Sequence, residues 1–240
     1  MKLSLSRALL VISLAGLALV GGAQDAVKHS LRFKPTVGQE ARMRSSININ
    51  LEGEEVQFTS ILRVKVTEVD KDGSFTLEEE AVEVKIFVSG TEIPVDDDMK
   101  KSAAGASRVD ARGVVKELTG GEIAAPDYRL SNLMSFVAPE KDVAVGDSWT
   151  YEHPASTKTG AVKARSEFKF EKIETVGGHE CAVVKVEFKE LEGENPSSMS
   201  GTFSIRLKDG QTVKLVGNAK KVLLDQEMEP VDIALSYELQ

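Results

Sequence analysis

The chain has 240 residues, with 30 Lys and Arg, 38 Asp and Glu, one Cys and 13 aromatic residues. That length is sufficient for one large all-β domain, or two small ones, around a real apolar core. A net charge of −8 without a basic block argues against a nucleic-acid partner, because binding phosphates requires clustered Lys and Arg. A single Cys excludes an internal disulfide and any Cys-rich metal site, and 41% hydrophobic residues argue against disorder as the main state.

Residues 1–23 have the three parts of a cleaved secretory signal peptide. Lys2 and Arg7 precede an apolar run over residues 8–20, and small residues precede a cut after Ala23. A helix of 13 residues spans only about 20 Å of a hydrocarbon core about 30 Å thick, so the run is too short to be a membrane anchor. We therefore predict an exported protein, periplasmic or extracellular.

No Cys follows the apolar run, so a bacterial lipid anchor is not expected at that point. No later stretch approaches 18 consecutive apolar residues, so we expect no transmembrane segment after signal cleavage. Removal of residues 1–23 leaves 28 basic and 38 acidic residues, a net charge of −10.

From residue 28 onward, apolar and polar residues alternate with a period of two, which is typical of strands with one buried face. Antiparallel sheets allow such one-sided burial. The pattern predicts an all-β fold with minor α content: a large antiparallel curved sheet or open barrel with one or two short helices. Between Leu77 and Val82 the apolar phase shifts, which predicts a bulge near residues 78–80. We interpret those three glutamates as solubilising charge at a strand edge.

An internal repeat predicts that two similar β units build the fold. Val37-Gly38 opens one β run and Val145-Gly146 opens another, and the hairpin after residues 66–69 corresponds to the one after residues 173–176. We predict a first β unit over residues 24–125, a short helical connector over residues 126–140 and a second β unit over residues 141–240. Whether the two units form one sheet or two domains stays open.

The connector carries an apolar stripe at helical spacing. Asp127 is the predicted cap of a helix over residues 127–137, and Pro139 follows its end. The helix is either a plug that fills the core or a lid over a groove. The groove interpretation makes four residues candidates for ligand contact: Leu130, Leu133, Met134 and Val137.

Three motifs resemble those of a family of exported bacterial β-rich proteins of unknown function. They are the strand start at residues 31–38 (LRFKPTVG), the hairpin at residues 66–73 (VTEVDKDG) and the strand start at residues 145–149 (VGDSW). The resemblance covers most of the mature chain and implies an envelope or secreted β-protein, without catalytic residues. At the level of the fold, a curved sheet with short helices is also similar to lipoprotein-carrier proteins.

Residues that could support catalysis or metal binding are few. Residues 146–148 (Gly-Asp-Ser) are shaped like an esterase nucleophile, but no His follows His179, so we favour a strand-entry turn. His179 and Cys181 would need His153 as a third metal ligand. A weak calcium candidate is the run Asp96, Asp97 and Asp98, for which a solvated acidic loop is the favoured interpretation.

These observations favour a non-enzymatic exported binding or structural protein, with no cofactor and no metal. Its partner is an unidentified envelope protein or an apolar ligand. The first alternative is a carrier that holds a lipid or a lipidated protein in an apolar groove. A hydrolase is the second alternative, which the sequence gives little reason to favour. A cavity lined by Leu, Val and Phe under residues 127–137 would favour the carrier, whereas a filled core would favour the binding module.

The signal-peptide pattern makes the mature N-terminus testable. Export with cleavage after Ala23 should give a chain that begins at Gln24, because signal peptidase selects small residues just before the cut. N-terminal sequencing of the exported protein measures this directly. An extracytoplasmic chain that still begins at Met1 would contradict the prediction.

Overall fold

The computed structural model describes residues 27–240 except 52, 97–103, 121–122 and 227. The predicted signal peptide and two residues of the calcium candidate, Asp97 and Asp98, lie outside the described residues, and Asp96 is exposed. The described parts form twelve strands and one helix: β1 (Glu40–Leu51), β2 (Glu54–Val69), β3 (Phe75–Val88), β4 (Thr91–Ile93), β5 (Gly105–Val109), β6 (Val115–Thr119), α2 (Ala125–Met134), β7 (Ser148–His153), β8 (Ala164–Val176), β9 (His179–Glu190), β10 (Ser198–Arg206), β11 (Thr212–Val222) and β12 (Val231–Leu239).

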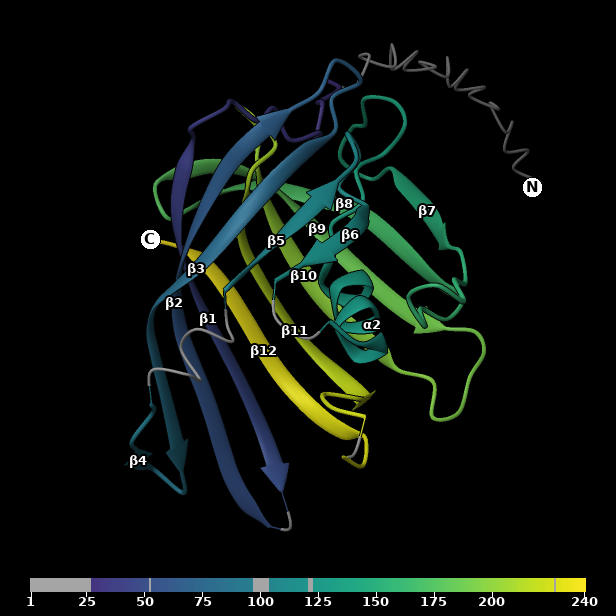
Figure 1. Ribbon diagram of the computed structural model, residues 1–240. Helices are drawn as coiled ribbons and strands as arrows, with labels where there is room; N and C mark the ends of the chain where they lie inside the picture. The colour runs from purple at the N-terminus through teal and green to yellow at the C-terminus, as the bar shows by residue number, and fades with distance from the viewer. Residues whose placement is uncertain (1–26, 52, 97–103, 121–122, 227) are drawn as a thin grey trace, which may run out of the picture.

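The strands form one antiparallel sheet in the order β6-β5-β3-β2-β1-β12-β11-β10-β9-β8-β7, and β4 pairs with the end of β3. The first and last strands meet at its centre, where Met43 of β1 pairs with Leu239 of β12. The edge strands β6 and β7 are consecutive in the chain, and α2 lies between them in sequence on the concave side (Figure 1). The predicted fold class, a large antiparallel curved sheet or open barrel with a short helix, is therefore confirmed.

Strands β1–β6, here called the first half, precede α2, and strands β7–β12, the second half, follow it. Both halves belong to the same sheet, which answers the question left open between one sheet and two domains. The similarity of the halves and the unit boundaries stay predictions.

The best-packed part of the core lies in the second half. Buried and exposed positions alternate over residues 164–170 of β8 and 184–190 of β9. Phe136, which follows α2, packs its ring against Trp149, Phe168 and Phe203. Burying each large apolar side chain contributes roughly 1.5–3 kcal/mol. The largest fully buried side chains come from the second half and from the α2 segment, apart from Leu31: Phe168, Phe170, Phe203, Leu31, Leu133, Ile205, Leu215, His153, Glu190, Val137, Val184 and Val186.

The bulge in β3 lies two residues later than predicted. Leu62 of β2 pairs with Ala81 and Ile61 pairs with Glu83, so Val82 is the extra residue. The shift falls after Ala81, and Glu79 therefore stays on the same face as Ala81. The strand-edge interpretation of the glutamates is also wrong for this residue, because β3 lies inside the sheet between β2 and β5.

His153 at the end of β7 is a buried histidine, with 1% of its surface exposed. Its Nε2 lies 2.9 Å from the Ser166 hydroxyl, and its Nδ1 is buried without a hydrogen-bond partner among the described residues. Rings of Tyr151 and Phe188 flank it. Burial disfavours the charged imidazolium and lowers the pKa of His153 to about 4.

This burial predicts a loss of stability on mild acidification. The unfolded chain binds a proton at His153 near pH 6.5 and the native chain does not, so the free energy of unfolding falls as the pH falls below 6.5. The expected loss is about 2 kcal/mol between pH 7 and pH 5. Urea unfolding at both pH values, compared between the unaltered chain and His153→Gln, isolates this contribution. An equal pH dependence in the two proteins would contradict the prediction.

Candidate functional site

An open pocket of about 570 Å³ lies on the concave side of the sheet. Strands β1, β2, β3, β5 and β6 form its walls, α2 adds one side, and residues of β10, β11 and β12 complete it. The volume falls within the range of about 300–1,000 Å³ that is usual for small-molecule sites. Its lining is mainly apolar, and the largest apolar side chains are Phe33, Met43, Ile47, Leu62, Val64, Val66, Phe75, Leu77, Val109, Val115, Leu118, Ile123, Leu130, Met134, Phe203 and Leu215.

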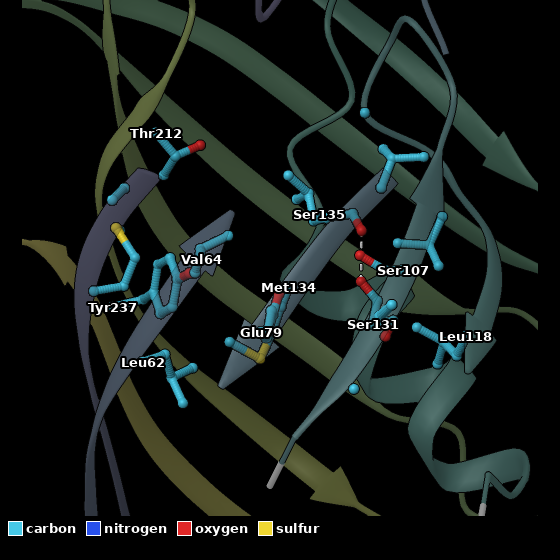
Figure 2. A pocket seen from close by; sticks show the side chains of 18 of the residues that line it. Leu62, Val64, Glu79, Ser107, Leu118, Ser131, Met134, Ser135, Thr212 and Tyr237 are labelled. Carbon is cyan, nitrogen blue, oxygen red and sulfur yellow. Dashed lines mark hydrogen bonds between the residues drawn. The ribbon is translucent and has the colours of Figure 1, made fainter. Parts of the chain in front are cut away.

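Strand register places these side chains in rows across neighbouring strands. Val64 of β2 pairs with Ala41 of β1 and with Glu79 of β3, and Leu77 of β3 pairs with Ser107 of β5. Along the chain, the lining extends from Gln39, just before β1, to Ile47 of β1, about 26 Å of extended backbone. Figure 2 shows side chains from the strands and from α2 around the pocket.

The helix begins and ends earlier than predicted. Its N-cap is Ala124, and Pro126 lies in the first turn, where its missing N–H costs no hydrogen bond. The Asp127 carboxylate reaches back and accepts a hydrogen bond from the Ala124 N–H at 2.7 Å, so Asp127 is not itself the cap residue. The last helical residue is Met134, and Ser135 is already extended, so Val137 lies beyond the helix.

The four predicted ligand-contact residues divide into two pairs. Leu130 and Met134 line the pocket, while Leu133 and Val137 are buried in the core at 2% and 0% exposure. One side of this segment thus fills the core of the second half, and the other side is a wall of the pocket. Their role in ligand contact stays a prediction.

A buried ion pair fixes α2 in position. Arg129 donates two hydrogen bonds to the Glu190 carboxylate, at 2.8 and 2.6 Å, and Glu190 is 1% exposed. The Ser197 N–H also donates to Glu190 at 2.7 Å, which satisfies the carboxylate further. Beyond the helix, the Trp149 indole donates to the Val137 carbonyl at 2.8 Å. The α2 segment is therefore held to the second half at two points, Arg129 in the middle of the helix and Val137 beyond its C-terminal end.

Glu79 is a site residue that sequence reasoning missed. It lies in the middle of β3 and lines the pocket, whereas Glu78 and Glu80 are exposed on the other face. Among the described residues, its carboxylate has no hydrogen-bond or ion-pair partner. Burial raises the pKa of Glu79, and its charge, together with burial, raises the pKa of Tyr237, which also lines the pocket. The signal available in the sequence was the apolar phase of Leu77 and Ala81, which places Glu79 on their face.

The three residues considered from the sequence as metal ligands, His153, His179 and Cys181, do not lie close together. His153 pairs with Ala164, at the far end of β8 from the hairpin that joins Val176 and His179, so the proposed metal ligands lie apart. Within the described ranges, no three His, Cys, Asp or Glu side chains are arranged to hold a metal ion.

Residues 146–148 form a strand-entry turn, as favoured from the sequence. Gly146 has a φ of 98°, which suits glycine, and the Asp147 carboxylate accepts a hydrogen bond from the Ala144 N–H at 2.9 Å. Asp147 thus stabilises the turn that leads into β7.

Comparison with solved structures gives a likeness that bears on the fold. No protein-family model matches the chain, and no curated protein matches it. A solved structure of lipovitellin, described for its lipid–protein interactions, is similar with a TM-score of 0.50 and 9% sequence identity, over 86% of this chain and 25% of that chain. The chain thus spans a quarter of the length of that protein, and at this identity the likeness concerns the fold alone.

The resemblance to a family of exported β-rich proteins stays a prediction. Among the described residues, no helix is long and apolar enough to cross a membrane.

The ion pair at α2 predicts a large effect of Arg129→Met. Loss of the guanidinium leaves the buried Glu190 carboxylate without its countercharge, which should destabilise the protein by roughly 3 kcal/mol. Urea unfolding at pH 7 measures the change. The matched control is Arg165→Met, whose contacts with Glu152 and Glu167 are exposed and should contribute less than about 1 kcal/mol. Equal destabilisation by the two variants would contradict this role of the pair.

Proposed function

We propose that the protein is an exported, non-catalytic carrier that binds a long-chain lipid in the concave pocket. The observation that carries this proposal is the mainly apolar pocket of about 570 Å³ between the first half of the sheet and α2. Its dimensions suit an extended alkyl chain, and its walls of Leu, Val, Met and Phe suit the apolar surface of such a chain. The signal-peptide pattern of residues 1–23 supports export.

The contrast between the two halves supports a carrier over a purely structural module. Protein interiors are normally packed as densely as organic crystals, and the second half of this sheet follows that rule. In the first half the residues facing the pocket are mostly only partly buried, Leu62, Val64 and Leu77 among them. An apolar ligand would remove this surface from water and stabilise the complex.

The similarity in fold to lipovitellin is weaker support for the same proposal. Lipovitellin, which is described for its lipid–protein interactions, has a similarly arranged sheet over most of this chain. A fold can host several functions, so the argument for lipid binding rests on the pocket and its lining.

Filling the pocket should abolish binding without unfolding the protein. Ser131 of α2 lines the pocket, and Ser131→Trp places an indole in the space that a ligand would occupy. We expect the unaltered chain to bind an environment-sensitive apolar dye with increased fluorescence, and the variant to bind it at least about tenfold more weakly. Fluorescence titration measures both affinities.

The matched control is Asn132→Trp, one residue along the same helix and outside the pocket lining. It should retain dye binding, because its indole does not enter the pocket. Thermal melts of both variants verify folding. Absence of dye and lipid binding by the unaltered chain, or equal binding by Ser131→Trp, would reject the carrier function.

A further inference from the structure

All three charged side chains that line the pocket within the described residues are acidic. Glu40 pairs with Lys65 at 3.3 Å on the exposed side, and the Asp127 carboxylate accepts the Ala124 N–H. Glu79 has no such partner among the described residues. No described Lys, Arg or His lines the pocket. Glu79 is therefore the one of these three carboxylates that has neither a cation nor a hydrogen-bond donor beside it among the described residues.

The neighbours of Glu79 make its ionised form costly in the empty pocket. Leu77 and Ala81 lie two residues away on the same strand face, Val64 pairs with it on β2, and Gly105 pairs with it on β5. None of these four side chains can donate a hydrogen bond. A carboxylate among apolar walls loses hydration, and an opposite charge brought into the pocket would restore the lost stabilisation.

Tyr237 is one of the neutral polar residues that line the same pocket. Burial, and to a lesser extent the charge of Glu79, raises the pKa of the Tyr237 hydroxyl above its usual value, so the hydroxyl is neutral. A neutral phenol can both donate and accept hydrogen bonds. The site thus combines a carboxylate that prefers a cation with neutral polar side chains, Tyr237 among them, inside a mainly apolar lining.

We propose that the pocket selects long-chain amphiphiles whose head carries a positively charged amine, held by the Glu79 carboxylate with the Tyr237 hydroxyl as a second contact. This inference rests on the proposed carrier function and specifies its ligand class. An anionic head, such as a carboxylate, would meet Glu79 without a compensating cation in the described lining, and repulsion would weaken its binding.

Three probes with the same twelve-carbon chain separate the contribution of the head from that of the chain: dodecylamine, dodecanol and dodecanoate. Displacement of the apolar dye at pH 7, below the micelle concentration of each probe, gives their affinities. The expected order is amine, then alcohol, then carboxylate, with the amine at least about tenfold tighter than the carboxylate.

The decisive variant is Glu79→Gln, which keeps the shape of the side chain and removes its charge. It should weaken dodecylamine binding about tenfold and leave dodecanol binding within about threefold. Glu78→Gln is the matched control, because Glu78 is the adjacent glutamate on the exposed face, and it should change none of the three affinities. The order of the three probes in the unaltered chain tests the proposal even if Glu79→Gln does not fold.

The outcomes distinguish the two proposals. Failure of all three probes and of the dye to bind rejects the carrier function itself. Equal affinities for the three heads, or an amine affinity unchanged by Glu79→Gln, leave the carrier function intact and overturn the preference for amines. Tighter binding of dodecanoate than of dodecylamine also overturns that preference.

Discussion

A curved sheet that does not close leaves one concave apolar face to be covered, and this requirement governs the rest of the structure. Pairing of β1 with β12 joins the two halves, so the open edges fall at β6 and β7, which are consecutive in the chain. The segment between those edges is the natural cover. It carries α2 and the buried residues Val137 and Ala138 across the concave side of the second half. The concave face of the first half is not filled by this segment. There α2 forms only one side of the open pocket.

The division between a filled and an open half follows from how the covering segment is anchored. Arg129 is held by Glu190 at the end of β9, and Val137 is held by Trp149 of β7, both in the second half. Leu133 and Val137 then complete the packed core, whereas Leu130 and Met134 face the pocket. A buried ion pair contributes modest net stability, but loss of either partner is costly. Its effect here is to fix one position of α2, and hence the dimensions of the pocket.

The environment of the Glu79 carboxylate is the opposite of that of the Glu190 carboxylate. Glu190 receives a guanidinium and a backbone N–H, while Glu79 projects into the pocket without a described partner. Unpaired polar groups in apolar surroundings lower stability, and proteins retain them mainly where they act on a ligand. The unpaired Glu79 carboxylate thus connects the electrostatics of the pocket to the proposed recognition of a cationic head.

The sequence by itself determined the strands, because period-two alternation is a local pattern that reports which residues share a face. It also located the connecting helix through the spacing of Leu130, Leu133 and Met134, although its bounds moved towards the N-terminus. Only the tertiary structure decided that β1 pairs with β12, that Leu133 is buried while Met134 faces a pocket, and that Glu79 faces it too. The position of the bulge at Val82 results from the register between β2 and β3. Register depends on contacts between residues distant in sequence, so the local period alone did not show whether the phase changes before or after the three glutamates.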